Sequence, residues 1–84
     1  MEIIPLSNQI LVEPDVEFKF TDIKYKYGKV LAIGEDVKKI KVGEYIGYAE
    51  YGINVLEIDD QRHYFITEDS EWLFCKIKKD DNKE

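Results

Sequence analysis

The chain has 84 residues, of which 44% are hydrophobic, and it carries a formal net charge of −6 at pH 7. These values describe one domain near the smallest size that buries an adequate core unaided, and they exclude an intrinsically disordered chain. The acidic balance also argues against nucleic-acid binding, because contacts with phosphates need a basic face.

Three features of the sequence indicate where in the cell the protein acts. No apolar run approaches the roughly 20 residues of a membrane span, and the start of the chain is acidic and broken by Pro5, unlike a secretory signal. One cysteine, Cys75, cannot form a disulfide framework. We therefore expect a cytoplasmic protein that binds neither membranes nor nucleic acid and whose partner, if it has one, is another protein.

The first half of the chain predicts short strands. Residues 10–12 form an apolar strand that ends at Pro14, and residues 16–27 alternate between apolar and polar side chains with a slip at residues 21–22. Residues 29–33 are more continuously apolar, which predicts a strand buried on both faces. Pro5 can lie only at a strand edge or outside the sheet.

Residues 41–58 are the stretch around which the other predicted elements are arranged. β-Branched and aromatic residues recur near period two in residues 44–48 and again in residues 53–58. Gly52 lies in the link between them and can adopt positive φ without steric cost. The pattern predicts a hairpin with its turn at residues 49–52.

The remaining elements are short. Residues 59–62 predict a polar turn, residues 63–66 a strand, residues 67–71 a single helical turn and residues 72–78 the last strand. The polar tail, residues 79–84, is expected to be disordered. Residues 1–78 are therefore predicted to form a single all-β domain, a small closed or nearly closed barrel.

The sequence offers little catalytic chemistry. His63 has no second histidine or cysteine nearby to complete a metal site, and Cys75 lies inside an apolar strand as a small buried or interface residue would. The acidic pairs at residues 59–60 and 68–69 fall in turns, where adjacent side chains point apart. No phosphate-binding glycine loop is present. We expect a protein that is not an enzyme and needs no cofactor.

Five segments occur in a recognisable order along the chain. They are IIPLSNQILV at residues 3–12, GKVLAIG at 28–34, KVGEYI at 41–46, YG at 51–52, and YFI followed by EDSEWL between residues 64 and 73. In this order they resemble the GroES co-chaperonin family. They are similar to the family's opening strand, its G-x-V-x-A-V-G segment, its K-V-G-D-x-V strand entry, its Y-G turn, and its short strand with the closing turn that follows.

The resemblance implies a GroES-like β-barrel subunit in a sevenfold ring, a heptamer, that caps a GroEL-type chaperonin. In the family, the first strand of one subunit pairs with the last strand of its neighbour, which uses exposed edges that otherwise aggregate. The alternative is that both strands complete a sheet within one monomer. The expected interface residues are Ile3, Ile4, Leu6, Leu73, Cys75 and Ile77.

Two departures from the family concern its loops. Only residues 14–27 are available for the family's long docking loop, and the candidate chaperonin-binding anchors there are Val16, Phe18, Phe20 and Ile23; an ordinary hairpin is the alternative. Residues 34–40 are too few for the family's roof hairpin, which implies an open-topped ring like those of co-chaperonins encoded by some bacteriophages.

The functional alternative is a GroES-like structural or protein-interaction module that no longer binds a chaperonin. The related barrel of zinc dehydrogenases is excluded, because the cysteine and histidine ligands and the nucleotide domain are missing. Tyr45, Tyr48 and Tyr51 are expected to face the ring interior, an interface or an ordinary sheet surface.

Overall fold

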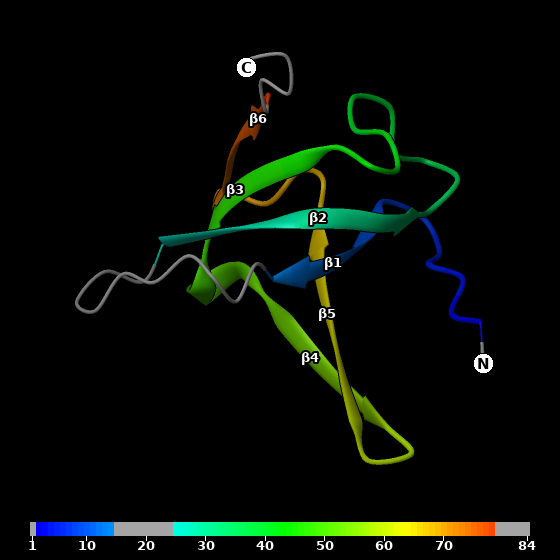
Figure 1. Ribbon diagram of the computed structural model, residues 1–84. Helices are drawn as coiled ribbons and strands as arrows, with labels where there is room; N and C mark the ends of the chain where they lie inside the picture. Colours follow the sequence, from blue (N-terminus) through cyan, green and yellow to red (C-terminus); the bar gives the residue numbers. More distant parts are fainter. Residues whose placement is uncertain (1, 15–24, 79–84) are drawn as a thin grey trace, which may run out of the picture.

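The computed structural model describes residues 2–14 and 25–78, which form a single antiparallel sheet (Figure 1). The strands follow the order β4-β5-β1-β2-β3-β6 across the sheet. Their bounds are β1 (Gln9–Pro14), β2 (Tyr25–Ile33), β3 (Tyr45–Ala49), β4 (Asn54–Ile58), β5 (Gln61–Thr67) and β6 (Leu73–Ile77), with a 3-10 turn, η1 (Glu50–Gly52), between β3 and β4. The all-β prediction is confirmed.

The sheet curls around one apolar cluster, as expected of a small, nearly closed barrel. β1 lies near its centre and pairs with β2 on one side and β5 on the other, while β4 and β6 lie at opposite ends of the strand order. Within residues 2–14 and 25–78, neither edge strand pairs with the other. The barrel is therefore partly open, with two free strand edges.

The predicted hairpin at residues 41–58 is wrong. β3 pairs with β2 and β6, and β4 pairs only with β5. The link between β3 and β4 is η1, where the Ala49 N–H donates to the Trp72 carbonyl at 2.9 Å and Gly52 lies directly against the Trp72 side chain. This contact turns the chain away from β3 instead of folding it back.

The hairpin of this region joins β4 to β5 and extends away from the other strands (Figure 1). Its two-residue turn consists of Asp59 and Asp60, with φ angles of 52° and 67°. Positive φ at both central residues is typical of a type I′ turn, which matches the twist of the two strands. Aspartate tolerates this conformation better than most residues other than glycine.

Two smaller predictions also differ from the structure. β2 is not buried on both faces, because Leu31 is 44% exposed while Val30 is fully buried. Residues 67–71 form hydrogen-bonded turns in place of a helical turn: the Ser70 N–H donates to the Thr67 carbonyl, and the Trp72 N–H donates to the Ser70 hydroxyl.

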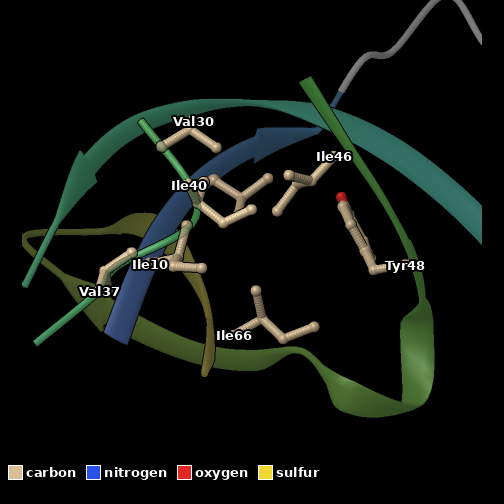
Figure 2. Packing of buried hydrophobic residues seen from close by; sticks show 8 residues of the cluster. Ile10, Val30, Val37, Ile40, Ile46, Tyr48 and Ile66 are labelled. Atoms are coloured by element: carbon tan, nitrogen blue, oxygen red, sulfur yellow. The ribbon is translucent and has the colours of Figure 1, made fainter. Parts of the chain in front are cut away.

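The core includes two residues from outside the strands (Figure 2). Val37 and Ile40, from the irregular connection between β2 and β3, are 8% and 6% exposed and pack with the strand residues. Tyr48 is 1% exposed, so the prediction that placed it on a ring or sheet surface is wrong. The strand members of the cluster are Ile10, Val12, Val30, Ile46, Tyr48 and Ile66.

Replacing Tyr48 by phenylalanine is expected to preserve or raise stability. The Tyr48 hydroxyl is buried without a hydrogen-bond partner among residues 2–14 and 25–78, and removing an unsatisfied buried polar group relieves a cost of about 1–3 kcal/mol. Ile46→Ala, a matched core truncation, should instead destabilise the protein by about 2–5 kcal/mol. Urea unfolding of both variants checks the contrast, and a loss above about 1 kcal/mol in Tyr48→Phe would contradict it.

The same variant should alter the alkaline limit of stability. Burial, followed by the charges of Glu50 and Tyr64, raises the pKa of Tyr48 from 10.0 to about 12. The unfolded chain therefore releases this proton first, so the contribution of the neutral phenol is present below pH 10 and is lost as the pH rises towards 12. Unfolding curves measured between pH 9 and 12 should fall less steeply for Tyr48→Phe.

Candidate functional site

The first candidate surface is the free edge of β6. β6 pairs on one side with β3, through Tyr45 with Ile77 and Gly47 with Cys75, and its other edge has no partner strand in the described part of the chain. Leu73 packs against the core, whereas Cys75 is exposed and Phe74 is 53% exposed. An exposed edge with apolar side chains is a template for pairing with another chain.

The N-terminal segment, residues 2–6, is the second candidate surface. It forms no strand, and Ile4 and Leu6 are each 69% exposed, while Ile3 is partly buried and Pro5 is buried. The Leu6 carbonyl accepts a hydrogen bond from the Gln9 N–H at 3.1 Å, which closes the turn before β1. This segment and β6 lie on opposite sides of the molecule (Figure 1), so they do not complete a common sheet within one chain.

A groove of about 300 Å³ follows the exposed side of β6. Phe74 and Ile40 line it, although the sequence did not identify either as a site residue. The only sequence signal was the position of Phe74 between the expected interface residues Leu73 and Cys75. The complete lining consists of Lys39, Ile40, Glu68, Leu73, Phe74, Cys75 and Lys76.

Charged side chains fix the wall of this groove. The Lys76 ammonium donates to the Lys39 carbonyl at 3.1 Å and lies 3.5 Å from the Glu44 carboxylate. Glu44 also accepts the Lys41 N–H at 2.8 Å, and this hydrogen bond, more than the nearby Lys76 charge, lowers the pKa of Glu44. The groove therefore combines an apolar floor with one positioned ammonium group, that of Lys76, which Glu44 holds from outside the lining.

The candidate chaperonin-binding anchors, Val16, Phe18, Phe20 and Ile23, lie outside the described residues. The structure does describe both ends of their segment. Pro14 at the end of β1 is the register partner of Gly28 in β2, and Tyr25 begins β2. The two strands that flank the segment in sequence, β1 and β2, are therefore antiparallel neighbours in the sheet.

Chemistry at the titratable residues is limited. His63 is partly buried, and its Nε2 has no hydrogen-bond partner among the described residues. It lines a hollow of about 730 Å³ next to the charged residues Glu13, Glu50 and Arg62. The described lining of that hollow includes no cysteine, serine or threonine to act as a nucleophile beside the histidine. Residues 2–14 and 25–78 contain no cluster of three potential metal ligands. They also contain no helix with the length and hydrophobicity of a membrane span.

Exposed aromatic residues mark the corner at η1. Tyr51 is 67% exposed, and its ring centroid lies 5.6 Å from that of Trp72, which is 37% exposed. Tyr45 is partly buried on β3 and meets the Tyr27 ring edge-on at 6.1 Å. Of the three tyrosines expected on a surface or interface, only Tyr51 is largely exposed.

No protein-family model matches the sequence, but curated proteins do. A protein named co-chaperonin GroES from Kosmotoga olearia is 31% identical over an alignment of 91 positions, which covers 94% of this chain and 100% of that protein. Proteins of the same name from two strains of Treponema pallidum are each 32% identical over 78 residues, covering 79% of this chain and 89% of theirs. The similarity extends well beyond any single motif.

Proposed function

Because the chain belongs to the GroES co-chaperonin family, we propose that it is the subunit of a ring that caps a GroEL-type chaperonin and assists protein folding. The observation that carries the proposal is the similarity to named co-chaperonins over almost the whole chain. The all-β sheet with two free edges supports it, because a subunit that assembles edge to edge needs such edges.

In the proposed ring, residues 3–6 of one subunit pair with β6 of the next. Two observations support this arrangement: Ile4 and Leu6 are exposed and outside the sheet, and the outer edge of β6 is unpaired in the described chain. Head-to-tail contacts between different patches generate a closed ring when the rotation closes. A sevenfold number and a cytoplasmic location stay predictions.

The proposed ring has an open top. The connection between β2 and β3 forms no strand, and Val37 and Ile40 point into the core instead of projecting outwards (Figure 2). A segment whose apolar residues complete the core of its own subunit is not available to form a roof. The buried positions of Val37 and Ile40 therefore support the expectation, drawn from the shortness of residues 34–40, that the ring has an open top like those of some bacteriophage co-chaperonins.

Mixing the protein with a GroEL-type ring and nucleotide tests the function directly. Co-migration on size exclusion at micromolar concentration is the expected result, since weaker interactions dissociate during the run. Absence of association would instead favour the alternative, a GroES-like interaction module without chaperonin contact. The isolated protein should also elute as an oligomer, because a monomer of 9.9 kDa contradicts the ring.

Replacing Phe18 and Phe20 by serine should abolish association with the chaperonin while leaving the oligomer intact. Large apolar anchors contribute most of the energy at such docking sites, and serine removes their buried area. Val55→Ser with Leu56→Ser is a matched control, because both residues are at least 50% exposed on β4 and lie outside the proposed docking segment. Unchanged binding of the phenylalanine variant removes these two residues from the mechanism.

A further inference from the structure

Residues 37–40, here called the strap, cross one end of the core. The strap belongs to the irregular connection between β2 and β3, and its two apolar side chains, Val37 and Ile40, point into the core cluster (Figure 2). The residues between them, Lys38 and Lys39, are exposed. The strap therefore closes the core with only two side chains.

Backbone hydrogen bonds hold the connection on both sides of the strap. Before it, the Gly34 N–H donates to the Gln9 carbonyl and the Asp36 N–H to the Ser7 carbonyl, both at 2.9 Å. After it, the Gly43 N–H donates to the Val30 carbonyl at 2.9 Å. The two sides of the strap are thus fixed to β1, to the turn before it and to β2.

The strap itself is held differently. The Glu68 carboxylate, from the turn between β5 and β6, accepts the Lys38 N–H at 3.0 and 3.1 Å and the Lys39 N–H at 2.6 Å. On the β6 side, the Lys76 ammonium donates to the Lys39 carbonyl at 3.1 Å. Two ionisable side chains, both far from the strap in the sequence, therefore position it, together with one local hydrogen bond that the Val37 N–H donates to the Gly34 carbonyl at 3.2 Å.

We propose that Glu68 is a latch, and that protonation of its carboxylate releases the strap from the barrel end while the sheet stays folded. Release uncovers the end of the core and removes Ile40 from the groove beside β6, which it also lines. Local opening of this kind is expected where exposed hydrogen bonds hold a segment, and its cost here is the exposure of two core side chains, Val37 and Ile40.

The charges around Glu68 set the direction of the response. Lys38 and Lys39 face it from the strap and Lys76 borders the same groove from β6, while Asp36 and Asp69 line the hollow on its other side. The hydrogen bonds from the Lys38 and Lys39 N–H groups lower the pKa of Glu68 from its ordinary 4.5. The charged Glu68 carboxylate therefore stabilises the closed strap fully above pH 4.5. This stabilisation is lost as the pH falls through the lowered pKa that Glu68 has in the folded protein.

Hydrogen exchange of individual backbone amides, measured by NMR on the full-length protein, tests the latch. In Glu68→Gln at pH 7, the protection factors of the Lys38 and Lys39 amides should fall at least about fivefold, the effect of losing one ordinary hydrogen bond. Glutamine retains one acceptor oxygen but turns an NH₂ group towards an N–H donor. Glu71→Gln, on the same turn and exposed, should change neither amide.

The amides of Ile10 and Val12 report whether the sheet stays folded, because both residues lie in the central strand β1. Unchanged protection of Lys38 and Lys39 in Glu68→Gln overturns the latch. If the variant loses the whole fold, the unmodified protein is titrated from pH 7 to about 2, through the lowered pKa of Glu68. The strap amides should then lose protection at a higher pH than Ile10 and Val12. Simultaneous loss at both places overturns the proposal.

Discussion

Gly34→Ala is expected to destabilise the protein by about 3 kcal/mol, which lowers the Tm of a domain of this size by roughly 12–24 °C. A Cβ atom at this position would overlap the Ser7 carbonyl and lie 2.7 Å from the Leu6 carbonyl carbon. Both contacts are with backbone. The Ser7 carbonyl also accepts the hydrogen bond of the Asp36 N–H. The backbone of Leu6 and Ser7 therefore cannot move away from the new Cβ atom without breaking that hydrogen bond.

Gly43→Ala separates this steric cost from a general effect of removing glycine. Gly43 has φ of 93°, but apart from its own chain neighbours no described residue has an atom within 4 Å of the place where an alanine Cβ would stand, so alanine there meets strain and no overlap. Its cost should be about 1–2 kcal/mol. Thermal unfolding at matched protein concentration gives both values, since association shifts the apparent Tm. Equal losses in the two variants would contradict the overlap at Gly34.

Local pattern was enough to find most of the strands. Alternation placed β3 and β4 close to their observed bounds, and the apolar runs located β1 and β6. It wrongly predicted that β3 pairs with β4, because a hairpin also shows a glycine such as Gly52 between two alternating runs. The contact that decides the case is between Gly52 and Trp72, 20 positions along the chain, and local pattern does not report contacts at that separation.

The core was predicted less completely for the same reason. Val37 and Ile40 lie in a run of charged residues with no strand alternation, so only the tertiary structure shows that they fill the barrel end. Tyr48 has the alternation of a surface strand, but on β3 its side chain points into the cluster. The family resemblance supplied the β6 edge as a candidate interface. The strap and its hydrogen bonds to Glu68 join residues about 30 positions apart, so only the tertiary structure shows them.

Ile4→Asp combined with Leu6→Asp is expected to convert the oligomer to monomers of about 9.9 kDa at micromolar concentration. In the proposed ring these side chains become buried against the neighbour's β6, and an unpaired carboxylate buried at an interface costs several kcal/mol per site. Every interface in the ring contains both substitutions, so each one loses the same binding free energy. Sedimentation velocity or light scattering measures the mass.

The monomer itself should remain folded, which makes the result interpretable. Both residues are 69% exposed and belong to a segment outside the sheet, so aspartate meets solvent there and leaves the core unchanged. Val42→Asp is the matched control, since Val42 is 59% exposed and belongs neither to residues 3–6 nor to β6. An oligomer that survives both aspartates would show that residues 3–6 do not form the subunit interface, even if the free edge of β6 does.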